Sequence, residues 1–350
     1  MSQRNAVSHA CPDCSPLSRR DFLRNTTAGI ATTAAAAGLY SLGGSPCLAA
    51  VAGSAASPAP SAESLVAQFY KTLSDDQKKS ICFAFDHPLR KKVDNNWFIV
   101  DKHIKDLLNK DQRQMVRDIF TGLHSEEYAD RVMHQVETDN GEDGGFNSCA
   151  VAMFGQPGEK FEFVFTGRHV TRRCDGNSVE GEGFGGPIFY GHAAEGFHES
   201  AQHKGNIYWY QALQANQVFQ ALDGKQRELA LRADARPERH TATVDLSEPK
   251  RALTGIPLSE LSADQKGLVR KVMADLLAPF RKADADKALA MIEAGGFDAM
   301  HMTFYNGKGM DIGNDGVWDV WQLESPNMVW YFRGAPHVHT WVHVREPARA

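Results

Sequence analysis

The sequence lacks several features that would assign it quickly to a class. Beyond its N-terminal region it has no run of 18 apolar residues, so no membrane span is expected in a soluble mature protein. Its 38 basic and 43 acidic residues give a formal charge of −5, which makes no electrostatic case for nucleic acid or an anionic membrane. It has no phosphate-cradling glycine loop, Gly-x-Ser-x-Gly elbow or c-type haem motif. Nucleotide and serine-nucleophile chemistry therefore has no positive support.

Cysteine is also scarce. Only six cysteines occur in 350 residues, and three of them lie in a segment that we expect to be removed. The remaining three, Cys82, Cys149 and Cys174, cannot form a complete set of intramolecular disulfides because their number is odd. One bridge, such as Cys149–Cys174, is compatible with an oxidising periplasm, but buried free thiols are the favoured interpretation.

The N-terminal segment has the pattern of a twin-arginine export signal. Arg19 and Arg20 stand before Phe22-Leu23 and a soft alanine- and threonine-rich run over residues 28–42. Small residues before position 53 supply a cleavage site, so we expect cleavage near Ala52 and a periplasmic or secreted product. The twin-arginine translocon would be its partner during export, and it carries folded cargo. An uncleaved N-terminal anchor is the alternative.

The expected organisation has three parts. We assign residues 1–52 to the signal peptide, 53–64 to a flexible linker, and 65–346 to a single domain. The signal segment holds four basic and two acidic residues, so its removal takes the formal charge from −5 to −7. What remains is long enough to bury a substantial core.

A short sequence motif recurs four times and predicts the starts of four helices. A leucine is followed by Ser, Asn or Asp and, three residues after that cap, by Gln and a basic residue. The cap oxygen can bond the free amides of the first turn, and the leucine can pack back onto the helix. The copies begin at Leu73, Leu108, Leu222 and Leu261. Spacings of 35 and 39 residues within each pair predict helical pairs around a central β region rather than a solenoid.

The middle and the end of the chain alternate as strands do. The segment 161–166 places Phe161, Phe163 and Phe165 on one face. Near the C-terminus we expect a meander with strands over residues 318–323, 328–333 and 337–345. The predicted class is therefore α+β, with helical pairs flanking and packing on a largely antiparallel β-sheet or meander.

The last of these strands presents three histidines. Period-two geometry puts His337, His339, Trp341 and His343 on one face and a valine-rich set suited to a core on the other. Two histidines at i and i+2 can converge on one ion because their Cβ atoms lie roughly 6–7 Å apart. Imidazole suits zinc, copper, iron or nickel, so the spacing does not choose the metal. The alternative is a strand face that is simply exposed.

A further histidine follows the phenylalanine strand, in Gly167-Arg168-His169. Continued alternation places His169 on the phenylalanine face and Arg168 on the opposite face, unless a bulge at Gly167 turns it. Neutral imidazole on an apolar face ligates metal well; the alternative is a core histidine bonded to a backbone carbonyl. We expect His169 to converge with His337 and His339.

Two loop segments are weaker candidates. The order His192-x-x-Glu195-x-x-His198 fits neither the zinc-protease helix nor its inverted form, so we interpret it as a loop that lines a pocket or supplies a ligand. Residues 311–316 imitate the start of a calcium loop but lack ligands at its third and twelfth positions. A hairpin turn is the favoured interpretation of that segment.

The chain contains four further short sequence motifs: residues 154–157 (FGQP), 165–170 (FTGRHV), 186–191 (GPIFYG) and 337–341 (HVHTW). Together they resemble the bacterial proteins grouped as domain of unknown function family 3500, over about residues 65 to 346. Family members carry a strand ending in Gly-His-His and a final strand with His-Ile-His.

Carried over by position, this resemblance implies that His169 matches the second His of the pair and that His337 and His339 match the terminal pair. Arg168 stands where the first His usually is. If that His is a ligand in relatives, this chain has lost one ligand, or His343 or His192 replaces it. The family name itself implies no activity.

Two functions are compatible with these features. The first is an exported metalloprotein with zinc or copper on His169, His337 and His339, acting as a metal-dependent hydrolase or oxidoreductase on an unknown substrate. Arg168 would stabilise an anionic substrate or oxyanion, and Glu195 would accept a proton.

The alternative function is a non-catalytic module. A face built from Trp330, Tyr331, Trp341 and Tyr190 would then bind a small molecule or a fragment of the cell envelope. Bound metal is the observation that separates the two hypotheses.

Overall fold

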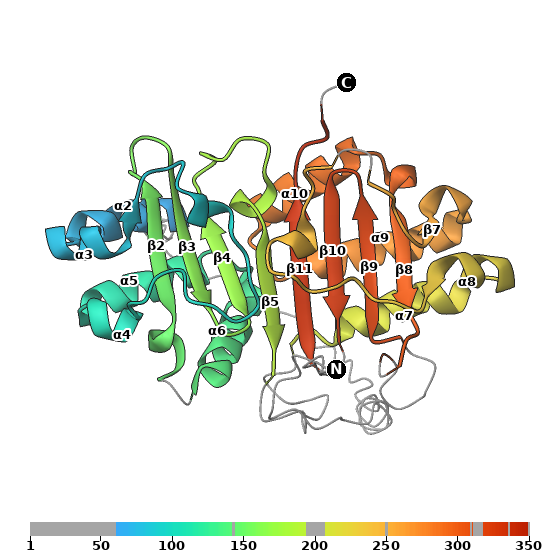
Figure 1. Cartoon of the computed structure of the whole chain (residues 1–350), viewed down its shortest axis with the longest axis horizontal. Coiled ribbons are helices and arrows are strands. Elements are labelled where there is room, and N and C mark those ends of the chain that lie inside the picture. The colour runs from blue at the N-terminus through green and yellow to red at the C-terminus, as the bar shows by residue number, and fades with distance from the viewer. Residues whose placement is uncertain are drawn as a thin grey trace, which may run out of the picture.

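The computed structural model describes residues 61–141, 144–193, 207–248, 251–308, 310, 318–334 and 337–348. Their strands form one eleven-stranded sheet in the order β1-β2-β3-β4-β5-β11-β10-β9-β8-β6, with β7 pairing off this path with β8 (Figure 1). Within these ranges the β1–β2 and β6–β8 pairs are parallel and the others are antiparallel. The predicted α+β fold on a largely antiparallel sheet is confirmed. The signal peptide, most of the linker, Glu195 and the 311–316 segment lie outside the described residues.

The described helices are α2 (Ala62–Thr72), α3 (Asp75–Ile81), α4 (Ile104–Leu107), α5 (Lys110–Thr121), α6 (Glu126–Asp139), α7 (Tyr210–Ala221), α8 (Gly224–Ala230), α9 (Ala263–Leu277) and α10 (Lys282–Ala294). The strands are β1 (Cys82–Phe83), β2 (Ala150–Gly155), β3 (Phe161–Gly167), β4 (Val170–Cys174), β5 (Ile188–His192), β6 (Leu231–Arg232), β7 (Ile256–Pro257), β8 (His301–Tyr305), β9 (Val320–Ser325), β10 (Met328–Arg333) and β11 (Val338–Val344).

The first described helix begins before residue 65, where the domain was predicted to start. Helix α2 begins at Ala62, capped by the side chain of Ser61, which accepts a hydrogen bond from the backbone N–H of Ser64. The last three residues of the segment 53–64, predicted as linker, are therefore helical. A serine cap ahead of an apolar stripe is the signal that marks this start.

All four predicted helix starts form capping boxes. In each, the cap side chain accepts from the backbone N–H of the glutamine three residues on, and the glutamine side chain accepts from the cap's own N–H. The glutamines also bond in pairs. Gln77 Nε2 lies 2.8 Å from Gln112 Oε1, and Gln226 Nε2 lies 3.1 Å from Gln265 Oε1. The glutamines of the repeated motif thus link α3 to α5 and α8 to α9 by hydrogen bonds.

The two halves of the chain repeat one plan, which the sequence analysis did not anticipate. Each half has a helix, a capping-box helix, a two-residue strand, a second capping-box helix, a further helix and four strands. In both, the two-residue strand pairs in parallel at the edge of the sheet. The sheet orders run inward from the two edges and meet at the antiparallel pair β5–β11, so a pseudo-twofold axis passes between these strands (Figure 1).

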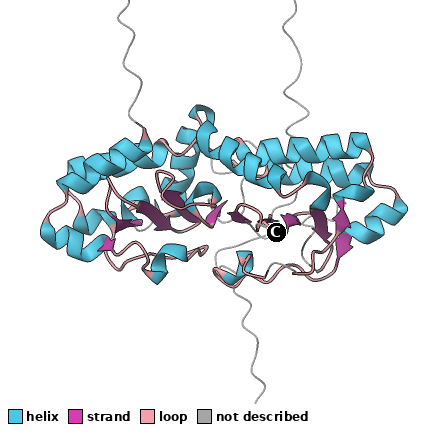
Figure 2. Cartoon of the chain, turned by 90° about the horizontal axis from the view of Figure 1, so that it is seen from above, coloured by secondary structure: helices cyan, strands magenta, loops and turns pink. Residues whose placement is uncertain are grey.

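Long helices cover one face of the sheet, and loops with short helical turns cover the other (Figure 2). The main core lies between helices and sheet and contains Phe163, Trp330 and Val342. The predicted phenylalanine face is part of it, because all three phenylalanines belong to this core. A smaller cluster that includes Tyr331 and Trp341 lies under the loops, and we call it the loop-face cluster. No described helix has the length and apolar character to cross a bilayer.

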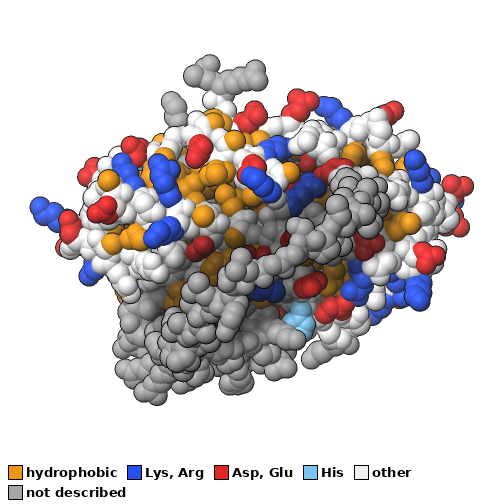
Figure 3. Space-filling view, turned by 180° about the vertical axis from the view of Figure 1, so that it is seen from behind, with side chains coloured by type: hydrophobic (Ala, Val, Ile, Leu, Met, Phe, Trp, Pro, Cys, Tyr) orange, Lys and Arg blue, Asp and Glu red, His pale blue; other side chains and the backbone are white. Residues whose placement is uncertain are grey.

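The surface charge of the molecule is mixed. Seen from behind, the visible side chains mix both charge signs with apolar groups and show no block of one sign (Figure 3).

Cys149 and Cys174 are buried and Cys82 is half-buried, and all three are free thiols. Burial raises the pKa of each thiol, so they remain protonated at neutral pH.

Candidate metal centre

The last strand has the two faces that its alternation predicts. Strand β11 lies between β5 and β10, so its side chains point alternately toward the helices and toward the loops. Val338 and Val342 join the main core, whereas Trp341 joins the loop-face cluster. His339 shares the face of Trp341, and His337 directly precedes the strand.

His169 reaches the same face by a route that alternation did not predict. Strand β3 ends at Gly167, which pairs with Val170, so Arg168 and His169 form a two-residue turn. His169 has a left-handed backbone, with φ of 58°, and its ring stacks beside Phe189 of the loop-face cluster. The expectation that His169 continues the phenylalanine face is wrong, because the turn ends the period-two geometry.

The turn is held from several sides. The backbone N–H of His169 donates to the carbonyl of Asn95 at 2.8 Å. The backbone N–H of Arg168 donates to the side-chain oxygen of Asn140 at 3.0 Å. A Cβ at Gly167 would lie 2.5 Å from the Sγ of Cys149, so glycine is required for the close approach.

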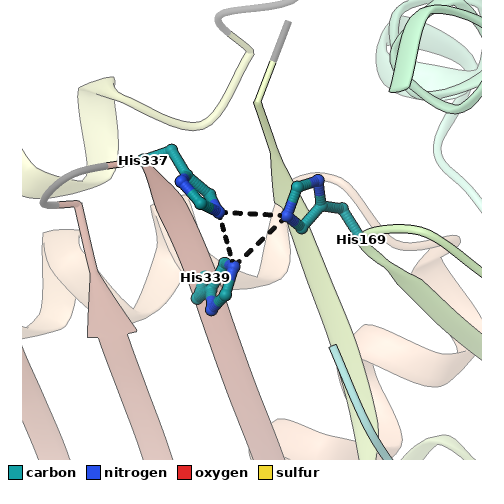
Figure 4. Close-up of side chains that lie close together, drawn as sticks. All are labelled: His169, His337 and His339. Atoms are coloured by element: carbon teal, nitrogen blue, oxygen red, sulfur yellow. Dashed lines mark hydrogen bonds between the residues drawn. The ribbon is translucent and has the colours of Figure 1, made fainter. Parts of the chain in front are cut away.

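The three imidazoles converge on one point (Figure 4). The Nε2–Nε2 distances are 3.1 Å for His169–His337, 3.2 Å for His169–His339 and 2.7 Å for His337–His339. All three residues are buried. A tetrahedral ion with metal–nitrogen bonds of about 2.0–2.1 Å separates its ligand nitrogens by about 3.3 Å. The observed triangle is slightly smaller than that, and the expected convergence is observed.

Two carboxylates lie behind the rings. Asp139 Oδ2, at the end of α6, is 3.2 Å from Nδ1 of His169, and Glu238 Oε2 is 2.7 Å from Nδ1 of His339. A neutral imidazole that donates its Nδ1–H to a carboxylate presents Nε2 as a lone pair, the form that binds metal. Arg333 Nη2 also lies 2.5 Å from Nδ1 of His339, and its Nε pairs with Glu238 at 2.7 Å. Nδ1 cannot satisfy both neighbours, because a carboxylate only accepts and a guanidinium only donates. Since Arg333 already pairs with Glu238, we assign the ring proton to Nδ1, directed at the carboxylate.

Burial keeps the rings of His337 and His339 neutral. Burial, reinforced by neighbouring positive charge, lowers the pKa of both His337 and His339 well below the usual imidazole range. Burial alone would raise the pKa of Asp139, but its interactions with His169 outweigh that effect and lower the pKa. Burial raises the pKa of Glu238, and Arg333 opposes the rise.

Three neutral imidazoles cannot satisfy one another at this spacing. With the ring protons of His169 and His339 directed at carboxylates, their Nε2 atoms are two acceptors 3.2 Å apart with no proton between them. His337 can donate at most one hydrogen bond from its Nε2, so a close acceptor–acceptor pair remains. A cation at the centre removes that repulsion, and the all-imidazole donor set suits a transition metal.

The cluster borders a cavity of about 900 Å³. All three histidines line it, together with Tyr331 and Trp341 of the loop-face cluster. Three protein ligands leave a fourth coordination position for water or a small molecule. The cavity gives such a molecule access to the cluster.

The other predicted site residues separate into two groups. Arg168 lines the cavity, whereas the proposed proton acceptor Glu195 lies outside the described residues. His343 does not join the cluster. Its Nδ1 lies 2.9 Å from the carbonyl of Val244 and its Nε2 lies 2.8 Å from Glu182.

The remaining candidates lie on the helix side of the sheet. His192 pairs with Val338 and stacks on Tyr208, so it shares the core face of β11 rather than the histidine face. Trp330 donates to the Tyr190 hydroxyl at 3.0 Å within the main core. The predicted aromatic binding face is therefore divided, and its two core members are not available to a ligand.

Sequence reasoning missed the two carboxylates. Asp139 is 30 residues from His169 and Glu238 is 101 residues from His339. Neither acid is spaced along the chain from a histidine as the residues of known metal motifs are. Both are far from the histidines in the sequence. No signal in one sequence could have found them, because the sheet and loops bring them together.

Fold and site define an α+β protein with a buried three-histidine cluster that can hold a metal ion. A family model described as protein of unknown function (DUF3500) matches residues 55–348, and the chain belongs to that family. No curated protein and no solved structure matches the chain. The family description names no reaction, so function has to be argued from the site.

Proposed function

We propose that this protein is an exported metalloenzyme that holds one transition metal, zinc or copper, on His169, His337 and His339. The observation that carries the proposal is the convergence of three buried Nε2 atoms, two of them on rings oriented by carboxylates. Carboxylate–histidine–metal arrangements of this kind are typical of built metal sites.

The chemistry follows from the donor set and the cavity. A bound metal with an open position supplies a Lewis acid that activates water or handles oxygen, so the enzyme is a hydrolase or an oxidoreductase. Arg168, which lines the cavity, binds an anionic group or a developing oxyanion. Asp139 and Glu238 position the rings and hold their Nδ1 protons. Glu195 is retained as the candidate proton acceptor.

Bound metal tests this proposal. The protein purified from the periplasm is expected to contain about one equivalent of metal by inductively coupled plasma mass spectrometry, and His339→Ala is expected to lose it. His343→Ala is the matched control, because it removes an imidazole from the same strand face outside the cluster. Equal metal content in the two variants would contradict the proposal.

Export is the second part of the proposal. Arg19 and Arg20 belong to a twin-arginine signal, a route that lets a metal be loaded before translocation. Changing both to lysine is expected to leave the protein in the cytoplasm, as cell fractionation would show. Arg24→Lys in the same segment is the control and should not change export. Normal export of the double variant would reject this route.

A further inference from the structure

The cavity beside the histidine cluster is lined by more positive than negative groups. Four guanidinium groups line it, against the two carboxylates of Asp94 and Glu238. The four are Arg168, Arg236, Arg239 and Arg333.

Both lining carboxylates already have cationic or imidazole partners. Asp94 bonds Nδ1 of His240, and Glu238 binds Arg333 and His339. Neither acid is available to neutralise a further cation. Neither acid therefore neutralises Arg239, whose guanidinium lines the cavity that a ligand would enter.

Arg239 is the arginine that a ligand can engage. Its backbone N–H donates to Thr243 Oγ1 at 2.7 Å, which fixes the chain at this point. Its side chain is exposed at the cavity wall, and no described residue forms an ion pair or hydrogen bond with its guanidinium. By contrast, the guanidinium of Arg236 is held by Glu324 at 2.6 Å.

The metal would add positive charge to the same cavity. Three neutral imidazoles contribute no negative charge, so a divalent ion would keep its full charge. An anion that enters the cavity can meet both the ion and a guanidinium. Tyr331 and Trp341 supply buried aromatic wall beside those charges, which suits a ligand with an apolar body.

We propose that the ligand of this cavity is a small organic carboxylate, bound through its charge by Arg239 and the metal and through its carbon skeleton by the aromatic wall. The inference rests on the proposed metal site. It adds the chemical class of the substrate, which that proposal leaves open.

Benzoate and benzamide provide the test, because they have nearly the same shape and differ in charge. On zinc-loaded protein, isothermal titration calorimetry is expected to show benzoate binding at least about tenfold more tightly than benzamide, as one charge-assisted contact would give. Arg239→Gln should weaken benzoate binding about tenfold and leave benzamide unchanged. Arg270→Gln on α9, whose guanidinium lies over the Phe297 ring, is the matched control and should change neither.

The outcomes separate the two proposals. Zinc content is measured first, and a protein that binds no zinc overturns the metal site and this inference together. If zinc binds but benzoate and benzamide bind alike, or Arg239→Gln leaves benzoate unchanged, only the carboxylate inference fails. Inorganic phosphate that binds with Arg239 dependence while benzoate does not would also overturn the choice of a carboxylate.

Discussion

Single residues behind the imidazoles would control how well those rings hold a metal ion. Asp139 accepts from Nδ1 of His169 and, through its other oxygen, from the backbone N–H of Ala193 at 2.9 Å. Asp139→Asn keeps the size but removes the charge, so zinc affinity measured by chelator competition should fall about 10–100-fold. Glu137→Gln, on the same helix and paired with Arg117, should leave the affinity unchanged. Unchanged zinc affinity in Asp139→Asn would mean that this carboxylate does not orient the His169 ring for metal binding.

His124 gives stability a pH dependence. Burial, with the charge of Arg172, lowers the pKa of His124 well below 6.5, and Arg172 Nε donates to its Nε2 at 3.1 Å. The ring is neutral in the folded chain, while the unfolded chain takes up a proton below about pH 6.5. The unfolded state then binds more protons, so the free energy of unfolding falls as pH drops. Between pH 7.5 and 5.5 this one group costs about 1.4 kcal/mol.

Substitution at His124 should remove that share of the pH dependence. The amide oxygen of His124→Gln can still accept from Arg172. Urea unfolding of the zinc-free protein at pH 7.5 and 5.5 should therefore show a loss about 1.4 kcal/mol smaller than in the parent. His134→Gln, an exposed position on α6, is the control and should keep the parent's loss. The same loss in both variants would contradict the assignment.

At the scale of elements, the sequence predicted what depends on near neighbours along the chain. Capping boxes span three residues and alternation spans two, so the four helix starts and the two faces of β11 were predictable. The face of His169 was not, because a turn at Gly167 interrupts the alternation. The loop that carries Glu238 was beyond prediction as well, since no local pattern says that it will cover His339.

The β5–β11 pair is the element contact on which the site depends most. Gly191 of β5 pairs with His339, and a Cβ at Gly191 would lie 2.0 Å from the Val338 carbonyl oxygen. Gly191→Ala must separate the two strands, so we expect at least about 2 kcal/mol loss in unfolding free energy and weaker zinc binding. In α9, a Cβ at Gly267 would meet nothing within 4 Å. Gly267→Ala should stabilise by about 0.5–1 kcal/mol and leave zinc binding unchanged.

At the scale of the whole molecule, the repeated plan produces one three-histidine site rather than two among the residues that the structure describes. The β3–β4 turn with His169 corresponds to the β9–β10 turn with Asn327, because the closing pairs are Gly167–Val170 and Ser325–Met328. Asn327 donates its side-chain N–H groups to backbone carbonyls and offers no imidazole. One zinc per chain is therefore expected in a direct titration. A stoichiometry of two would show that the halves are functionally equivalent.

The site also joins the halves. His169 belongs to the first half, and His337 and His339 belong to the second, so one ion would be bonded to both across the pseudo-twofold axis. An ion that binds only the folded chain stabilises it by about 2.7 kcal/mol when free ion is at 100 times Kd. For a domain of this size the melting temperature should then rise by about 4–5 °C in one transition. His339→Ala should abolish the rise, whereas His343→Ala should keep it. A second transition that zinc does not move would mean that the halves unfold separately and that the ion stabilises only one of them.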